Sequence, residues 1–192
     1  ANVTAGQELT VTLEEGYEDH FMLDLGWTVS GNATAGTWER GVPVGTTFQG
    51  VTSNPNSDFA TDLGDRCYVT GNGGGGAGFD DVDGGQTVLT SPLMDLTSYE
   101  NPSIEFRYWF FNAGGNGSPN DLLEVFLSNG TDTISLGSYD TSGPIWRRGL
   151  VEDIQDFITI TDAMSMIFRA SDLTPGHLVE AGIDAFEVNN NP

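Results

Sequence analysis

The strongest limit on how this chain can fold is its pattern of short runs that alternate apolar and polar residues, with glycine between the runs. In residues 104–111, Ile, Phe, Tyr and Phe alternate with Glu, Arg, Trp and Phe, which predicts a strand covered on both faces. A second run, 123–127, is followed by Asn129-Gly130, a dipeptide that favours a hairpin turn because both residues tolerate a positive φ. Convincing helical periodicity is almost absent.

Many short strands, with a turn signal about every ten residues and no alternation of strand with helix, predict an all-β antiparallel jelly-roll sandwich of two sheets. Only residues 151–157 suggest a helix. We expect one domain over 1–192, with its core at about 20–188. Residues 1–15 are polar and suit a linker or an edge strand, and 189–192 resemble a linker within a longer protein.

The charge of the chain narrows the range of partners. It has 28 acidic residues against six basic ones, all of them arginine, and a formal net charge of −22. Because nucleic acids are held by Lys and Arg on their phosphates, this charge excludes them and disfavours anionic membranes and sulfated polysaccharides. No apolar run approaches the ~20 residues of a membrane span. Metal cations are the natural partners of such a surface.

Motifs that would indicate catalysis are missing. The chain has neither His-Glu-x-x-His nor Gly-x-Ser-x-Gly, and its two histidines, His20 and His177, are expected at the surface or in loops. The glycine-rich stretch 71–78 lacks the lysine of a phosphate-binding loop, and Cys67, the single cysteine, is expected to be a buried apolar side chain. A hydrolase with paired carboxylates stays an alternative, since 28 acids permit such a pair without indicating one.

Asp184 is the most informative acidic residue. By alternation it shares a strand face with Phe186 and Val188, the face expected to point into the core. A bare carboxylate there would cost several kcal/mol unless it were paired or bound to a metal. Calcium, which takes six to eight oxygen ligands, is one compensation, and an ion pair with Arg169 is the other.

The stretch 80–85 resembles the start of a calcium loop, with Asp81 and Asp83 as alternate acids before a glycine turn. It is not an EF-hand, because no Glu closes a twelve-residue loop in either register. The two aspartates are therefore either calcium ligands or part of a solvated acidic turn.

Tryptophans offer a second kind of site. Trp38, Trp109 and Trp146 would form a sugar-stacking platform if their rings were exposed on one face. In a sandwich of this size the alternative is that they pack in the core.

Several segments together carry a family resemblance: Gly26-Trp27-Thr28, residues 36–43, 67–72, 81–85, 89–92, 107–110, 119–121, 168–172 and 179–184. Over about residues 20–188 the chain resembles the MAM-like jelly-roll modules of secreted bacterial proteins, sandwiches of the concanavalin-like or galactose-binding-like kind. Such modules often follow zinc carboxypeptidase or immune inhibitor A type metallopeptidase domains.

The resemblance implies a buried Ca²⁺ held by an acid of the first strand, an Asp in a Pro-x-x-Asp loop and an Asp of the last strand. Asp58 matches the loop, with Gly64 six residues later, and Asp184 matches the last strand. Asp24 is the nearest candidate for the first ligand, although the family has Phe-Glu there. Ala185 also departs from the pattern, because the family often has a second acid at that position.

We therefore expect a non-catalytic, calcium-stabilised accessory or adhesion module of a secreted or cell-surface bacterial protein. Its partners would be neighbouring domains and a glycan or protein surface. A carbohydrate-binding module for a neutral polysaccharide is the alternative, and a hydrolase is a further one.

Overall fold

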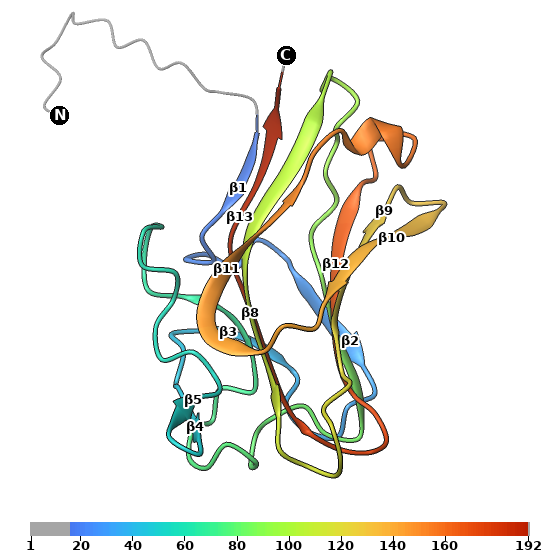
Figure 1. Ribbon diagram of the computed structural model, residues 1–192. Coiled ribbons are helices and arrows are strands. Elements are labelled where there is room, and N and C mark those ends of the chain that lie inside the picture. The colour runs from blue at the N-terminus through green and yellow to red at the C-terminus, as the bar shows by residue number, and fades with distance from the viewer. Residues whose placement is uncertain (1–15, 192) are drawn as a thin grey trace, which may run out of the picture.

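A computed structural model describes residues 16–191, which form two antiparallel β-sheets stacked face to face (Figure 1). The six-stranded sheet has the order β11 (Gly143–Val151), β8 (Pro102–Ala113), β13 (Leu178–Asn190), β6 (Cys67–Thr70) and β3 (Trp38–Gly41), with β1 (Tyr17–Asp19) also paired to β13. The five-stranded sheet has the order β10 (Thr133–Tyr139), β9 (Leu123–Ser128), β12 (Ser165–Asp172), β7 (Gly85–Thr90) and β2 (Thr28–Gly31). The prediction of an all-β jelly-roll sandwich is confirmed.

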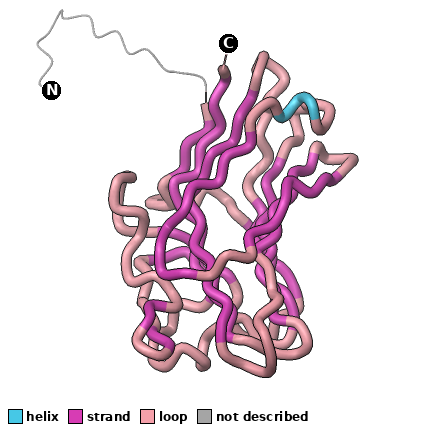
Figure 2. The backbone as a smooth tube through the Cα atoms, in the orientation of Figure 1, coloured by secondary structure: helices cyan, strands magenta, loops and turns pink. Residues whose placement is uncertain are grey.

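Helical structure in the described residues is limited to η1 (Ile154–Asp156), the short cyan turn in Figure 2. The helix suggested for 151–157 is confirmed only as this 3-10 turn, because β11 runs through Val151 and Asp153 then adopts a left-handed conformation with φ 51°, which a right-handed helix does not tolerate. No helix in residues 16–191 is long and apolar enough to span a membrane.

The main core fills the space between the sheets. On β8 the residues Ile104, Phe106, Tyr108 and Phe110 face this core, as the alternation predicts. Phe106 packs edge-on against Phe168 of β12, with ring centroids 4.9 Å apart, so the two sheets interlock through aromatic rings. The residues that alternate with them, Glu105, Arg107, Trp109 and Phe111, belong to the opposite face of the six-stranded sheet.

A second, smaller core covers that outer face. Trp109 and Phe111 of β8 pack there with Ala77 and Leu178, while Phe48 and Trp146 close over them. Its cover comes from two excursions on either side of β6, residues 42–66 and 71–84; the first includes the β4–β5 hairpin (Thr47–Phe48 and Val51–Thr52), which lies outside the sheet in Figure 1. Both faces of β8 are therefore covered, which confirms the prediction for residues 104–111.

The predictions for the two ends of the chain have different outcomes. Asn189 and Asn190, expected to begin a linker, complete β13 and pair with Ser103 and Pro102. Residues 1–15, expected as a linker or edge strand, lie outside the described residues. Cys67 is a buried free thiol, as predicted.

Candidate functional site

A β-bulge in β13 determines where the Asp184 side chain lies. Ala185 has φ 44°, and between Asp184 and Glu187 the register with β8 shifts by one residue. Ile183 before the bulge and Phe186 after it both face the main core, so Asp184 points to the outer face of the six-stranded sheet. The expectation that Asp184 shares a face with Phe186 and Val188 is therefore wrong, although its complete burial is as predicted.

Asp184 is buried by the loop that follows β5. Its Oδ2 accepts a hydrogen bond from the backbone N–H of Phe59 at 2.7 Å, and its Oδ1 accepts one from Ala185 at 2.8 Å. The same loop brings carboxylate oxygens of Asp58 and Asp62 to within 4.8 Å of one another and of Asp184. Three acids from two distant parts of the chain thus meet on one side of the sheet.

Asp62 is the least compensated of the three. Its side chain is only 3% exposed, and neither carboxylate oxygen receives a hydrogen bond from the described residues. His20 lies beside it, with Nδ1 3.3 Å from Asp62 Oδ2 and Nε2 2.8 Å from Glu18 Oε1. A small cavity of about 140 Å³ adjoins these residues.

Burial and nearby negative charge disfavour the ionised forms of Asp58 and Asp184. Burial raises the pKa of Asp184 to about 8, and the nearby negative charge of Asp62 adds to the rise. The pKa of Asp58 is also raised, by burial first and then by Asp62 and Asp65. A divalent cation would reverse this balance, since it favours ionised carboxylates.

The arginines do not supply the missing positive charge. Arg169, the alternative partner of Asp184, instead donates to both carboxylate oxygens of Glu124 on the other sheet, so that alternative is wrong. Arg107 lies opposite Asp184 in the register but pairs with Glu105 at 3.0 Å and covers the ring of Phe59.

Asp24 is not brought to this cluster. It is exposed, and its Oδ1 accepts a hydrogen bond from the N–H of Gly26 at 3.1 Å. The acid that approaches from β1 is Glu18, through His20. Glu18 follows Tyr17, which gives an aromatic–Glu pair close to the family's Phe-Glu, so this signal was present in the sequence. The only signal for Asp62 was its position four residues after Asp58.

Asp81 and Asp83 have different surroundings. Asp81 is 4% exposed and its Oδ1 has no hydrogen-bond partner in the described residues, whereas Asp83 is exposed. Burial, followed by the charges of Asp83 and Asp172, raises the pKa of Asp81 to about 7. Neither acid belongs to the two groups of potential metal ligands found in residues 16–191. A metal at this pair stays a prediction.

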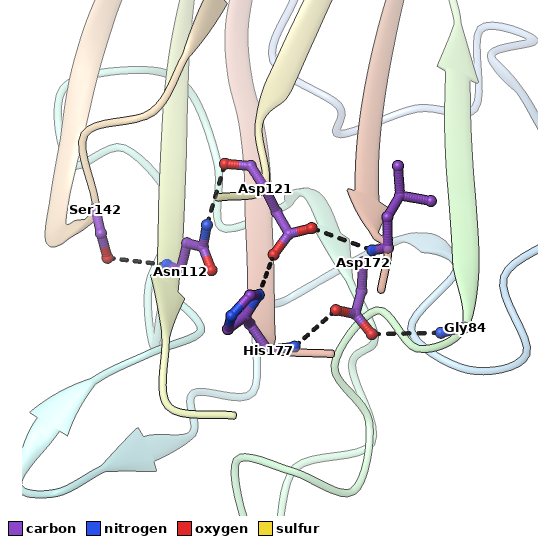
Figure 3. A network of polar contacts seen from close by, with 7 residues as sticks. Gly84, Asn112, Asp121, Ser142, Asp172 and His177 are labelled. Atoms are coloured by element: carbon purple, nitrogen blue, oxygen red, sulfur yellow. Dashed lines mark hydrogen bonds and ion pairs between the residues drawn. The ribbon is translucent and has the colours of Figure 1, made fainter. Parts of the chain in front are cut away.

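The second group lies where β12 ends and just before β9 and β13 begin, and sequence reasoning missed it (Figure 3). Asp121, Asp172 and His177 are all buried. His177 Nδ1 lies 2.8 Å from Asp121 Oδ2, and the His177 backbone N–H donates to Asp172 Oδ1 at 2.8 Å. Leu173 and Gly84 donate backbone hydrogen bonds to the remaining oxygens of the two acids.

This network ties loops together and does not assemble a catalytic triad. His177 lies in a loop, one of the two positions expected for it, and it is buried there. Its Nε2 receives no hydrogen-bond partner from residues 16–191, so no hydroxyl is positioned for activation there. Because each oxygen of Asp121 and Asp172 already accepts a hydrogen bond, the group serves to fasten the loops.

Two of the tryptophans hold the excursion 42–66 against the protein. Trp109 Nε1 donates to the carbonyl of Ser53 at 2.6 Å, and Trp146 Nε1 donates to the carbonyl of Ser57 at 3.1 Å. Trp38 is 3% exposed, and its Nε1 donates to the carbonyl of Thr87. Trp146 is half-buried, edge-on to Trp109. These rings do not form an exposed platform on one face.

No protein-family model and no curated protein sequence matches this chain. Solved structures resemble it in shape. The K2 adhesin domain of Lys-gingipain superposes with a TM-score of 0.57 at 12% identity, covering 92% of this chain and 98% of that one. The K1 adhesin domain of Lys-gingipain from Porphyromonas gingivalis gives 0.54 at 14%, covering 93% and 100%. The enzymatically active domain of bacteriophage CBA120 tailspike protein 4 gives 0.52 at 13%, covering 88% of this chain and 20% of that one. At these identities the likeness establishes a shared β-sandwich fold alone.

Proposed function

We propose that this chain is a non-catalytic β-sandwich module of a secreted or cell-surface protein, with an accessory or adhesive role, stabilised by Ca²⁺ at Asp58, Asp62 and Asp184. The observation that carries the proposal is the buried Asp62 carboxylate, which faces two further acids and has no hydrogen-bond donor among the described residues. The adhesin domains of Lys-gingipain, which share the fold, support an adhesive role. The MAM-like resemblance and a bacterial source belong to the same proposal.

The donor set fits calcium. The three carboxylates offer oxygen ligands, which Ca²⁺ prefers. Asp58 and Asp62 would hold the ion from the loop and Asp184 from β13, while the ion supplies the positive charge that no arginine provides there. Since β13 is central in its sheet, the bound ion would fasten the covering loop to the middle of the fold. The function is thus structural, presenting a rigid module to neighbouring domains.

Thermal unfolding of the EDTA-treated protein, with and without Ca²⁺ and with Mg²⁺ as the control ion, tests this proposal. At a hundred times its Kd a bound ion stabilises the fold by about 2.7 kcal/mol. For a domain of this size we expect a rise in Tm of roughly 5–11 °C. Asp62→Asn should abolish the rise, whereas Asp24→Asn, which alters an exposed acid outside the cluster, should retain it. An equal rise in both variants would contradict the site, and no rise in the natural chain would contradict the calcium.

Carbohydrate binding is the second candidate, favoured by a polar cleft on the other sheet. The predicted ring platform of Trp38, Trp109 and Trp146 does not serve it, because those rings pack against the protein and Trp38 and Trp109 are buried. A glycan site in this module would therefore have to use another surface.

A further inference from the structure

The outer face of the five-stranded sheet carries a cleft of about 360 Å³. Its floor comes from neighbouring strands: Ser171 of β12 lies opposite Gln86 of β7, and Arg169 of β12 lies opposite Glu124 of β9. Residues 120–122 and Leu173 form the walls. The volume lies within the range of ligand pockets, roughly 300–1,000 Å³.

The floor holds a rigid pair of charged groups. Arg169 donates two hydrogen bonds of 2.8 Å to the two oxygens of Glu124, through Nε and Nη2. Its guanidinium also lies over the ring of Phe126, 4.7 Å from the ring centroid. Two of the five N–H groups of Arg169 are used in this way, so the others remain for a ligand.

Uncharged hydrogen-bonding groups surround this pair. The side-chain amides of Gln86 and Asn120 and the hydroxyl of Ser171 make no hydrogen bond to residues 16–191. They offer both donors and acceptors within one cleft. Leu173 is 61% exposed and provides an apolar surface at the rim.

The surroundings favour an uncharged ligand. Glu124 neutralises Arg169, so the floor has no free positive charge, and the protein as a whole carries −22. An anionic ligand would meet a repulsive field, and the floor offers no unpaired acid to select a cation. Asp121, the remaining acid of the lining, is occupied by His177 and the N–H of Leu173.

The surroundings also disfavour a peptide added as an extra strand. β7 is paired on one side with β2 and on the other with β12, and β9 is paired with β10 and β12. No sheet edge is therefore open at the floor, and only side-chain groups are available for recognition.

We infer that this cleft binds a neutral oligosaccharide, with sugar hydroxyls on Gln86, Ser171 and the Arg169–Glu124 pair, and an apolar sugar face on Leu173. The inference rests on the proposed function, since it gives the non-catalytic module its ligand. A sugar matches the cleft because each ring presents many hydroxyls, which both donate and accept, beside an apolar face of C–H groups.

Native affinity gels containing mixed-linkage β-glucan, xylan, galactomannan, galactan or amylose test the inference, with dextran sulfate as the anionic probe. All lanes contain saturating Ca²⁺. We expect retardation by at least one neutral polysaccharide and none by dextran sulfate. Gln86→Ala and Ser171→Ala should each weaken retention about tenfold, because a lost hydrogen bond leaves a sugar hydroxyl unpaired. Thr90→Ala, on the same strand as Gln86 but outside the cleft, should leave retention unchanged.

Absence of retardation by all five neutral polysaccharides would overturn the inference. Retardation that is unaffected by Gln86→Ala and Ser171→Ala would overturn it too, as would preference for dextran sulfate. Each variant is accepted only with a Tm equal to that of the natural chain in Ca²⁺. The calcium-dependent rise in Tm is measured separately, so a failed cleft with an intact rise rejects this inference alone, while a lost rise rejects the proposed function.

Discussion

Replacing the carboxyl of Asp81 by an amide, in Asp81→Asn, is expected to stabilise the metal-free protein at neutral pH and to have little effect near pH 4. Asp81 is 4% exposed, and its Oδ1 has no hydrogen-bond partner in the described part of the chain. Burial first, then the charges of Asp83 and Asp172, raises its pKa from 3.8 to about 7. Its carboxyl therefore keeps a proton in the folded state at pH values where the unfolded chain has lost it.

The direction and the size of this effect on stability follow from the linkage between proton binding and folding. Because the folded state binds the extra proton, the free energy of unfolding falls as pH rises from about 4 to 7 and then levels off. The difference between 3.8 and about 7, at about 1.36 kcal/mol per pH unit, sets an upper limit of about 4 kcal/mol. The amide introduced by Asp81→Asn cannot ionise, so the variant avoids this loss.

Urea unfolding in EDTA at pH 4, 6 and 7.5, followed by tryptophan fluorescence, measures the difference. We expect the stability advantage of Asp81→Asn to grow steadily over this range and to approach a few kcal/mol at pH 7.5. Asp24→Asn, which removes the same charge at an exposed position, should show little of this growth. If the free energy of unfolding of each variant differed from that of the natural chain by the same amount at all three pH values, the reasoning about burial would be refuted.

Two packing predictions accompany it. Gly182→Ala places a Cβ 2.7 Å from Cη2 of Trp146 and 3.2 Å from Cβ of Trp109. The new methyl group should displace the Trp146 ring and lower the free energy of unfolding in urea by about 1–3 kcal/mol. An unchanged urea midpoint would contradict the close packing of the second core. Phe168→Ala removes a fully buried ring that contacts Phe106 between the sheets. It should lower the free energy of unfolding by about 3–5 kcal/mol. A loss below about 1 kcal/mol would show that the packing of the two sheets does not depend on this contact.

The parts of the fold set by local sequence were predictable. Alternation identified β8 as covered on both faces, and Asn129-Gly130 marked the β9–β10 hairpin, in which Ser128 pairs with Thr133. Such features depend on neighbours along the chain and on backbone preferences that glycine and asparagine reveal.

The bulge at Ala185 could not be predicted in this way. A φ of 44° usually indicates Gly or Asn, and alanine gives no such signal. One extra residue in a strand shifts the alternation, so that side chains on the two sides of the bulge no longer follow one pattern. The uninterrupted alternation therefore placed Asp184 on the wrong face of the sheet. Asp62 and the cleft at Gln86 were missed for another reason: each depends on segments that are distant in sequence and composed of ordinary polar residues.

The outer faces of the two sheets differ in how far they are covered, and this difference separates the residues proposed to stabilise the fold from those proposed to bind a ligand. The middle of the six-stranded face is covered by the excursions 42–66 and 71–84, the first of them held by the bonds from Trp109 to Ser53 and from Trp146 to Ser57. Two of the acids proposed to bind calcium, Asp58 and Asp62, belong to that cover and the third, Asp184, lies beneath it, so an ion there would stabilise the fold. The five-stranded face keeps unpaired amides and a hydroxyl in an open cleft. We therefore expect a large partner that binds a sheet face to use the five-stranded side, and we expect calcium to change its affinity only through the fraction of folded protein.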